Sequence, residues 1–312
     1  MSILRKYKTF DEILPDFLVE KRMSMQHKSY LAYPGRCEIF SKWLTEHGLS
    51  KTPLKKISNA QVASFYSWVS EVRDLDRATV EKYIVAIRSL FQYAQKRGEV
   101  SDIPFGLVVL PVKKRDCSPK YIPADKQSAL LQDMYKTDFQ LFLACMVQYF
   151  CALRPGKELR LVKVKDFDLK EGAVHVSKMN AKTGKERYIT LPDELAGYLR
   201  EYGVEHADPE HFLFGKKRKI GPSHVSINNL RERFNVFRSR HGISKEVKFY
   251  SWKHTGGTDL VHMRLLSVTQ LQNHFGHDRI TSTEKYIEEC GGKINRDLKD
   301  KFKSRLNLNK TA

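Results

Sequence analysis

The chain has 312 residues, more than a single hydrophobic core usually holds, so two domains are expected. Hydrophobic residues make up 41% of the sequence and aromatic residues 11%, which excludes a largely disordered chain. A formal charge of +19 is typical of a nucleic-acid binder, although an acidic protein partner or a membrane surface stays open as an alternative.

The N-terminus shows no targeting segment. Its first eight residues run into an acidic amphipathic stretch without the apolar core of a signal peptide. The longest apolar stretches, Phe142–Leu153 and Phe105–Val112, are too short to cross a bilayer. We therefore expect a cytoplasmic protein, associated with the nucleoid where DNA lies, with no membrane partner.

Residues 1–100 are predicted to form an all-helical bundle. Helical patterns cover Phe10–Lys21 and His27–His47, and Pro34 with Gly35 must kink or delay the second of these helices. Four helices in this span give a compact domain.

The third and fourth helices of this bundle carry clear sequence signals. Ser58 and Gln61 have the spacing of a capping box, which predicts the start of the third helix. Gly98 is placed to end the fourth helix. The core-facing residues of the fourth helix recur three or four apart: Val80, Ile84, Ile87, Phe91 and Ala94.

Residues 101–122 are predicted to be a basic linker, because helical periodicity is lost and prolines recur. Lys113, Lys114 and Arg115 lie within it, and we expect them to contact DNA phosphates, since such contacts release counterions without reading sequence. A merely solvated linker is the alternative.

Residues 123–290 are predicted to mix helices with a small antiparallel sheet, so that the whole chain is mainly α. Ala173–Ser177 and Arg187–Leu191, with Gly184 near the turn, form a hairpin pattern. A helix over Leu195–Tyr202 follows, closed by Gly203. A later helix places four apolar residues on one face: Ile227, Leu230, Phe234 and Phe237.

Two further segments have the composition of contact surfaces. The basic run Lys216, Lys217, Arg218 and Lys219 is expected to touch DNA phosphates, with a localisation-like patch or a solvated loop as alternatives. In the tail, residues 291–312, apolar residues at helical spacing predict an amphipathic helix: Ile294, Leu298, Phe302 and Leu306.

The cysteines give no metal or disulfide pattern. The five are scattered, without a C-x-x-C pair or nearby histidines, so we expect reduced thiols, no metal site and no cofactor. Phosphoryl transfer would then need a nucleophile, cationic donors and an acid from side chains alone.

Three short motifs offer such side chains in order along the chain. Leu153-Arg154-Pro155-Gly156-Lys157-Glu158 precedes the hairpin, and Tyr250-Ser251-Trp252-Lys253-His254-Thr255 follows it. Near the C-terminus, His274-Phe275-Gly276-His277 is followed, nine residues after His277, by Tyr286. Each residue alone has an ordinary structural reading, as a half-buried tyrosine or a helix-end ion pair, and the order of the set carries the signal.

This set resembles the tyrosine recombinase family, whose active site combines an arginine and a following acidic residue, a hairpin lysine, a His-x-x-Arg motif, a Gly-His pair and a tyrosine. The resemblance covers nearly the whole chain and implies a helical core-binding domain and an α+β catalytic domain that close around duplex DNA. It assigns the first arginine to Arg154, the acidic residue to Glu158, the hairpin lysine to Lys182, the second histidine to His277 and the nucleophile to Tyr286.

Two departures from the family pattern concern the same centre. Tyr250 and Lys253 stand where the His-x-x-Arg motif has its histidine and arginine, with His254 as a possible substitute base, and the interval from Arg154 to Glu158 is one residue longer than usual. Lysine supplies charge but lacks the planar fork of arginine. Removal of one transition-state donor costs about 10²–10³ in rate, so these departures predict a slower centre rather than a dead one.

The resemblance implies a site-specific recombinase that forms a 3′-phosphotyrosine and a four-way junction, as a homotetramer on paired sites of double-stranded DNA. It also implies that the tail docks on a neighbouring protomer, with folding back on its own domain as the alternative. A DNA-binding regulatory protein with a degenerate site, and a related topoisomerase, stay open. So does the participation of a host DNA-bending protein.

Overall fold

The computed structural model describes residues 7–110, 112 and 120–291. Lys113, Lys114 and Arg115, the cations expected to contact DNA from the linker, lie outside these residues, as does the tail from residue 292. The chain divides into two compact units, Met1–Cys117 and Ser118–Ala312, which we describe separately.

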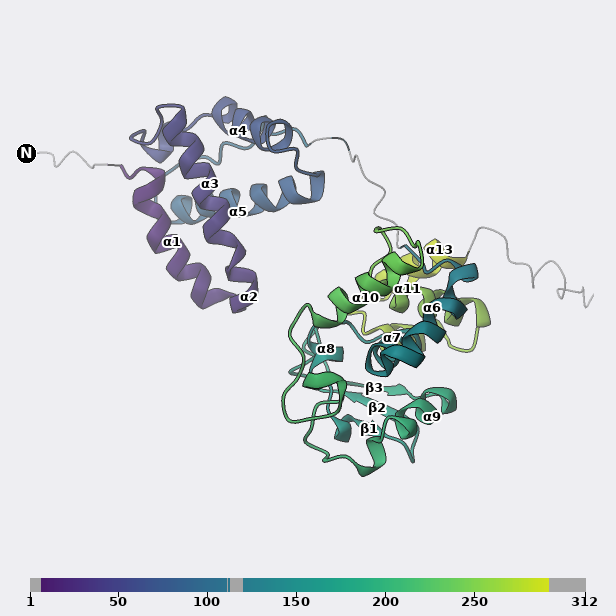
Figure 1. Cartoon of the computed structure of the whole chain (residues 1–312). Helices are drawn as coiled ribbons and strands as arrows, with labels where there is room; N and C mark the ends of the chain where they lie inside the picture. Colours follow the sequence, from purple (N-terminus) through teal and green to yellow (C-terminus); the bar gives the residue numbers. More distant parts are fainter. Residues whose placement is uncertain (1–6, 111, 113–119, 292–312) are drawn as a thin grey trace, which may run out of the picture. The chain divides into compact units, whose positions relative to one another are not determined.

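The named elements of the first unit, within the residues that the structure describes, are all helices (Figure 1). Its elements are α1 (Phe10–Ser24), α2 (His27–Tyr30), α3 (Ala32–Glu46), the 3-10 helix η1 (Leu54–Lys56), α4 (Asn59–Glu71) and α5 (Arg77–Lys96).

Side-chain caps fix where these helices begin. Thr9 forms a capping box with Glu12 at α1. The predicted box at α4 is confirmed, because the Ser58 hydroxyl accepts from the Gln61 N–H at 3.2 Å and the Gln61 amide oxygen accepts from the Ser58 N–H at 2.9 Å. Gly98 follows the end of α5 with a positive φ of 67°, as predicted.

The helical span predicted over His27–His47 is present and is interrupted, as a kink or delay from Pro34 and Gly35 implied, but at a different position. The chain breaks at Leu31, between α2 and α3, rather than bending at Pro34 and Gly35. Proline lacks an N–H and its ring collides with the carbonyl four residues earlier, which here belongs to Tyr30. The break places Pro34 in the first turn of α3, where no N–H bond is required.

Aromatic rings fill the core of the first unit. Phe40 makes edge-to-face contacts with Phe10, at a centroid distance of 4.9 Å, and with Phe65 at 4.7 Å. The predicted inner face of α5 is buried apart from Ile84, which packs at the margin of this core.

The second unit contains helices and one small sheet. Its elements are α6 (Ala124–Thr137), α7 (Phe139–Cys151), α8 (Lys157–Arg160), η2 (Val164–Asp166), β1 (Phe167–Asp168), β2 (Ala173–Val176), β3 (Arg187–Thr190), α9 (Asp193–Glu201), η3 (Val204–His206), η4 (Lys216–Arg218), α10 (Asn229–Arg240), α11 (Ser251–Met263), α12 (Val268–Phe275) and α13 (Ile280–Gly291).

Helix α7 runs through the core of this unit, and Figure 1 shows the strands gathered below it with α10 and α11 above. Its residues are apolar on all sides and nearly all buried, as expected of a central helix. Gly256 allows α11 to pack closely against it, since a Cβ there would lie 1.9 Å from the Tyr149 carbonyl oxygen. This crossing sets the end of α7 beside α11.

The strands form an antiparallel sheet in the order β1-β2-β3, which confirms the predicted hairpin. Val174 pairs with Ile189 and Val176 with Arg187, so that Arg187 and Ile189 share the buried face of β3. The mainly α fold with a small antiparallel sheet was predicted correctly. Ile227 was assigned wrongly, because it precedes α10 and its side chain is 65% exposed.

No described helix is long and apolar enough to cross a membrane. Cys37, Cys145 and Cys151 are free and buried. Within the described residues, no group of three or more His, Cys, Asp or Glu side chains is arranged to hold a metal ion.

Candidate active site

Arg154 follows the C-terminal end of α7, where Ala152 adopts a left-handed conformation that turns the chain away from the helix. The Arg154 guanidinium donates to Glu158 Oε1 at 2.8 Å and to the Gly276 carbonyl at 2.9 Å. The Arg154 backbone N–H donates to Glu158 Oε2 at 3.0 Å. These bonds fix the arginine while leaving its side chain 17% exposed.

Glu158 is a shared acceptor at the base of the site. Its side chain is 1% exposed and accepts from Arg154, from Arg187 Nη2 at 2.9 Å and from the Lys182 N–H at 3.3 Å. Burial alone would raise the pKa of Glu158, but the charge and hydrogen bond of Arg187, together with Arg154, lower it to about 2. One ionised carboxylate therefore joins the arginine turn to the hairpin.

Sequence reasoning missed Arg187 as a member of this site. The signal was present, because Arg187 occupies an inward position in β3, two residues from buried Ile189, where a charge needs a partner. Its Nε and Nη1 atoms are buried and have no hydrogen-bond partner among the residues that the structure describes. Arg187 thus adds positive charge that Glu158 only partly balances.

Lys253, on the first turn of α11, lies at the centre of the site and is only 4% exposed. Its Nζ donates to the Ala152 carbonyl at 2.6 Å and to the Phe275 carbonyl at 3.1 Å. Burial, followed by the charge of Arg154, lowers the pKa of Lys253 well below its ordinary value. These two bonds to backbone carbonyls do not favour the expected bond from Lys253 to a phosphate oxygen.

The turn after α12 presents His277. Gly276 ends the helix with a positive φ of 62°, and a Cβ at this position would lie 2.7 Å from Arg187 Cζ and 3.1 Å from Arg154 Nη1. Glycine is therefore required at this position for two reasons, the left-handed backbone conformation and the closeness of the two guanidinium groups. His277 Nδ1 lies 2.9 Å from the hydroxyl of buried Thr283 on α13, which orients the imidazole.

Tyr286 is carried by α13 and packs against three rings. The ring centroids of Phe275, His254 and His277 lie 5.0, 6.0 and 6.3 Å from that of Tyr286. The Tyr286 hydroxyl donates to the His254 carbonyl at 3.0 Å. Gly257 leaves space for this hydroxyl, since a Cβ there would lie 2.5 Å from it.

Tyr250 and His254 occupy one side of the centre, with ring centroids 4.8 Å apart in an edge-to-face contact. Burial raises the pKa of the Tyr250 hydroxyl, and the charge of Arg154 offsets part of that rise. Tyr250 therefore stays a neutral hydrogen-bonding group at pH 7.

The histidines around the centre share an excess of positive charge. Burial, followed by the charge of Lys253, lowers the pKa of His254 to about 4. Burial and the charges of Lys253 and Arg187 lower the pKa of His274 to about 4. Burial and the charges of Lys253, Arg154 and Arg187 lower the pKa of His277 to about 4. These imidazoles are neutral at pH 7, and the surroundings suit an anion.

Lys182 lies in the exposed turn between β2 and β3. Its backbone N–H bond to Glu158 and the ion pair between Lys185 and Asp278, at 2.7 Å, hold the turn beside the segment that follows His277. Lys182 itself is exposed to solvent.

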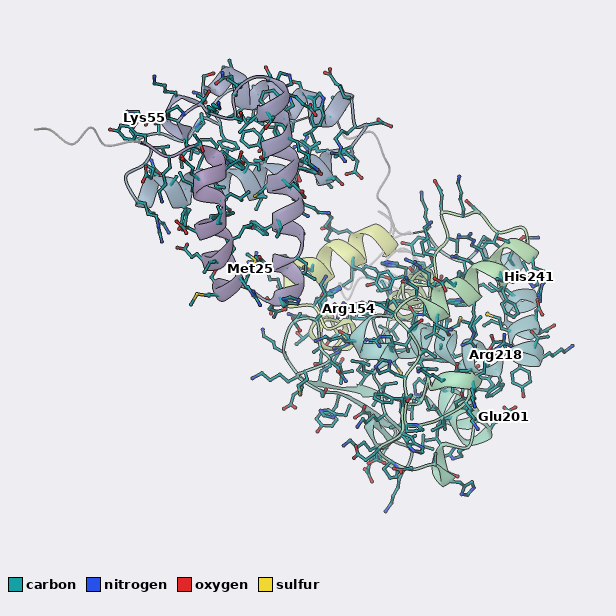
Figure 2. The ribbon with its side chains drawn as sticks, turned by 60° about the vertical axis from the view of Figure 1, so that its left-hand side comes forward. Met25, Lys55, Arg154, Glu201, Arg218 and His241 are labelled. Atoms are coloured by element: carbon teal, nitrogen blue, oxygen red, sulfur yellow. The ribbon has the colours of Figure 1, made fainter. Side chains whose placement is uncertain are left out.

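The basic run from Lys216 to Lys219 lies elsewhere in this unit. Arg218 is near Asp138, which caps the N-terminus of α7, whereas Arg154 follows the C-terminus of that helix. Thirteen residues of α7 separate the two ends by about 20 Å, and Figure 2 shows Arg154 and Arg218 well apart. The structure thus unites the eight expected catalytic residues but not the basic run.

A cavity of about 210 Å³ adjoins the site on the side of Tyr250. Its wall includes Pro155 and Gly156, directly after Arg154, and three cationic side chains, Arg160, Arg231 and Lys248. Sequence reasoning missed these cations, because they are dispersed along the chain and form no run.

Two family models match this chain. Residues 120–290 match the phage integrase family, and residues 14–98 match the N-terminal SAM-like domain of phage integrases. A tyrosine recombinase of Pseudothermotoga lettingae is 26% identical over 277 residues, which cover 87% of this chain and 91% of the relative. Tyrosine recombinase XerD of Pseudomonas aeruginosa is 24% identical over 299 residues, covering 92% and 94%.

Solved structures of related fold were determined with DNA. The Tn1549 transposon integrase in complex with transposon right end DNA is similar with a TM-score of 0.74 at 16% identity, over 89% of this chain and 94% of that one. A lambda integrase tetramer bound to a Holliday junction gives 0.73 at 16% identity, over 93% and 80%. These likenesses establish the fold of both units.

Proposed function

The chain belongs to the phage integrase family of tyrosine recombinases, and from this premise we propose that it cuts and rejoins DNA through a covalent bond to Tyr286. The observation that supports this proposal most is the convergence of Arg154, His277 and Tyr286 from three separate elements. Arg154 binds the carbonyl that precedes His277, and the His277 and Tyr286 rings lie side by side.

In the proposed first step, Tyr286 Oη attacks the scissile phosphorus in line with the departing 5′ oxygen. The new bond joins Oη to the 3′ phosphate, and the bond from phosphorus to the 5′ oxygen breaks. Lys182 gives a proton to that oxygen, and neutral His254, whose ring stacks on that of Tyr286, is the group available to accept the phenolic proton. Arg154 and His277 bind the nonbridging oxygens, whose charge grows in the transition state.

Glu158 and Tyr250 have supporting roles in this proposal. Glu158 orients Arg154, Arg187 and the Lys182 turn through four hydrogen bonds. Tyr250 is proposed to donate a hydrogen bond to the phosphate, and it cannot act as a base because burial raises its pKa and keeps the hydroxyl protonated.

The reverse step recombines DNA when the attacking 5′ hydroxyl comes from a second duplex. The phosphotyrosine retains the energy of the broken bond, so the rejoining needs no external energy source. We propose that two such exchanges pass through a four-way junction held by four copies of this chain. The likeness to the lambda integrase tetramer, solved on a Holliday junction, supports this assembly.

Affinity for duplex DNA is proposed to come from dispersed cations. Arg160, Arg231 and Lys248, beside Tyr250, are positioned to bind phosphates next to the scissile one. The basic run from Lys216 to Lys219 and the linker residues Lys113, Lys114 and Arg115 are proposed to contact phosphates farther along the duplex.

The proposal is tested by trapping the covalent adduct. The protein is incubated with duplexes from around its own gene that carry a nick near the cleavage position, so that the short 5′ product diffuses away. A denaturant-stable, protease-sensitive adduct is expected with the wild type and with the control Tyr188→Phe, and it should be absent with Tyr286→Phe. Tight binding of the native site without any adduct would instead identify a DNA-binding protein with a degenerate centre.

A companion measurement separates recombination from topoisomerase activity. A recombinase is expected to yield new junctions only when two sites are present. If the protein relaxed supercoiled DNA that lacks such sites as fast as supercoiled DNA that contains them, the recombinase assignment would be contradicted.

A further inference from the structure

The amino group of Lys253 lies between the ends of two helices. Its two acceptors are the carbonyl of Ala152, which caps the C-terminus of α7, and the carbonyl of Phe275, the last residue of α12. The last carbonyls of a helix have no partner within it and carry its negative partial charge. Both ends therefore offer acceptors that a single buried donor group can satisfy.

Each bound carbonyl stands two residues before a residue of the candidate site. Ala152 precedes Arg154 by two positions, and Phe275 precedes His277 by two positions. The Arg154 bond to the Gly276 carbonyl joins the same two segments a second time. The distance between Arg154 and His277 thus depends on two connections, one made by the Lys253 amino group and one by the Arg154 guanidinium.

We propose that Lys253 is a positioning residue, which ties the ends of α7 and α12 together so that Arg154 and His277 bind one phosphate as a pair, and that Lys253 does not itself bind the phosphate. The inference rests on the function proposed above, and it changes the role expected for this position in the chain.

Burial supports the division of roles. Lys253 is 4% exposed with both of its hydrogen bonds directed to backbone carbonyls, whereas the Arg154 side chain is 17% exposed. A neutral amine still has two N–H donors, which is the number that the two carbonyls accept. Burial and the Arg154 charge lower the pKa of Lys253, and losing the proton would not cost either bond. A phosphate ligand, in contrast, would need the charge.

The test compares Lys253→Met with the wild type in the absence of DNA. Methionine keeps the apolar stem and removes both hydrogen bonds. Amide hydrogen exchange should become faster by about tenfold or more in peptides that cover 148–156 and 270–278, as expected when one or two buried bonds are lost. Exchange in the first unit and in β2 and β3 should be unchanged. The exposed control Lys170→Met should leave every peptide unchanged.

DNA binding and adduct formation supply the second readout. Lys253→Met should bind duplex DNA with unchanged affinity, and at saturating DNA it should form the Tyr286 adduct more slowly. Unchanged exchange at 148–156 and 270–278, or a loss of DNA affinity like that of Arg154→Ala, would overturn the proposal. If the methionine variant loses cooperative unfolding, Lys253→Gln, which carries its two N–H donors on a shorter stem, is measured in the same way with the same deciding outcomes.

Failure of this inference is distinguishable from failure of the proposed function. The exchange measurement needs neither DNA nor catalysis, while the adduct test depends on Tyr286 whatever the role of Lys253.

Discussion

Glu158 is the only carboxylate among the described side chains that contact Arg154 and Arg187, and both guanidinium groups bind it. Removing one member of a buried ion pair leaves an uncompensated charge, which costs about 3–5 kcal/mol. We expect Glu158→Gln to lower the free energy of unfolding by about this amount in urea denaturation. The exposed control Glu171→Gln should change the free energy of unfolding little. An unchanged free energy of unfolding in Glu158→Gln would show that the arginines do not depend on this carboxylate.

The buried histidines predict a particular dependence of stability on pH. His274 has a pKa of about 4 in the folded protein, below its unfolded value near 6.5. The unfolded chain binds more protons between these values, so stability is complete above pH 6.5 and falls as the pH decreases toward 4.

The variant His274→Gln isolates this contribution. It should flatten the decline of unfolding free energy between pH 6.5 and 4, by up to about 3 kcal/mol over the window, as measured by urea denaturation at several pH values. Glu158, with a pKa of about 2, contributes mainly below pH 4.5 and stays outside most of that window. An unchanged pH profile in His274→Gln would contradict the buried, neutral state of this histidine.

At single positions, the sequence allowed candidate site residues to be proposed but not their bonds. The order of the three motifs singled out Arg154, His277 and Tyr286, which the structure brings together, because each motif keeps its spacing locally. The partners of Lys253 and Arg187 were not predictable, since Ala152, Phe275 and Glu158 are brought to them only by the packing of separate helices and strands.

Among the elements, the turn between α12 and α13 combines a close steric contact with a left-handed backbone conformation at Gly276. Gly276→Ala would add a Cβ 2.7 Å from Arg187 Cζ and hold a side chain at a positive φ. A misplacement of about 1 Å in a catalytic group can cost about 10²-fold in rate, and we expect a loss of that order in single-turnover adduct formation. Gly197→Ala in α9 serves as the control, because no described atom outside the neighbouring backbone of that helix lies within 4 Å of the added Cβ. Equal rates for the two variants would argue against a precise placement of His277.

Prediction of the elements succeeded where periodicity and end signals agreed. The helix α4 combines a capping box with a regular apolar face, and β2 and β3 flank a turn with Gly184 at a positive φ. Prediction failed where one signal stood alone: Ile227 fits the helical spacing but precedes α10. The strand β1 was not predicted, because its two residues are too few to show alternation.

For the molecule as a whole, the charge of +19 predicts DNA binding that depends strongly on salt. The logarithm of the association constant should fall linearly with the logarithm of salt concentration, with a slope of about −0.9 for each phosphate contact. Replacing Lys216, Lys217, Arg218 and Lys219 with glutamine should reduce this slope by about 0.9 for each contact that they make. A slope equal to that of the wild type would show that this run binds no phosphate. Because the run lies far from Arg154, the measurement also tests how far the DNA-binding surface extends from the candidate active site.

The two units differ in whether they contain candidate catalytic residues. The first has a closed aromatic core and matches an N-terminal SAM-like domain, and the second contains all eight candidate catalytic residues. Fold and family follow from features spread over the whole chain, whereas the proposed chemistry depends on a few side chains at the ends of α7 and α12 and within α13.

The central claim is that Tyr286 becomes covalently joined to the 3′ side of a broken strand, and peptide mapping of the adduct tests it most directly. The adduct is formed with a cleaved strand labelled at its 5′ end, digested with trypsin and sequenced by mass spectrometry. We predict that the labelled strand is attached to the peptide that begins at Tyr286, since Lys285 precedes it. Attachment to another residue, or retention of a label placed at the 3′ end instead, would contradict the assigned nucleophile or the direction of cleavage.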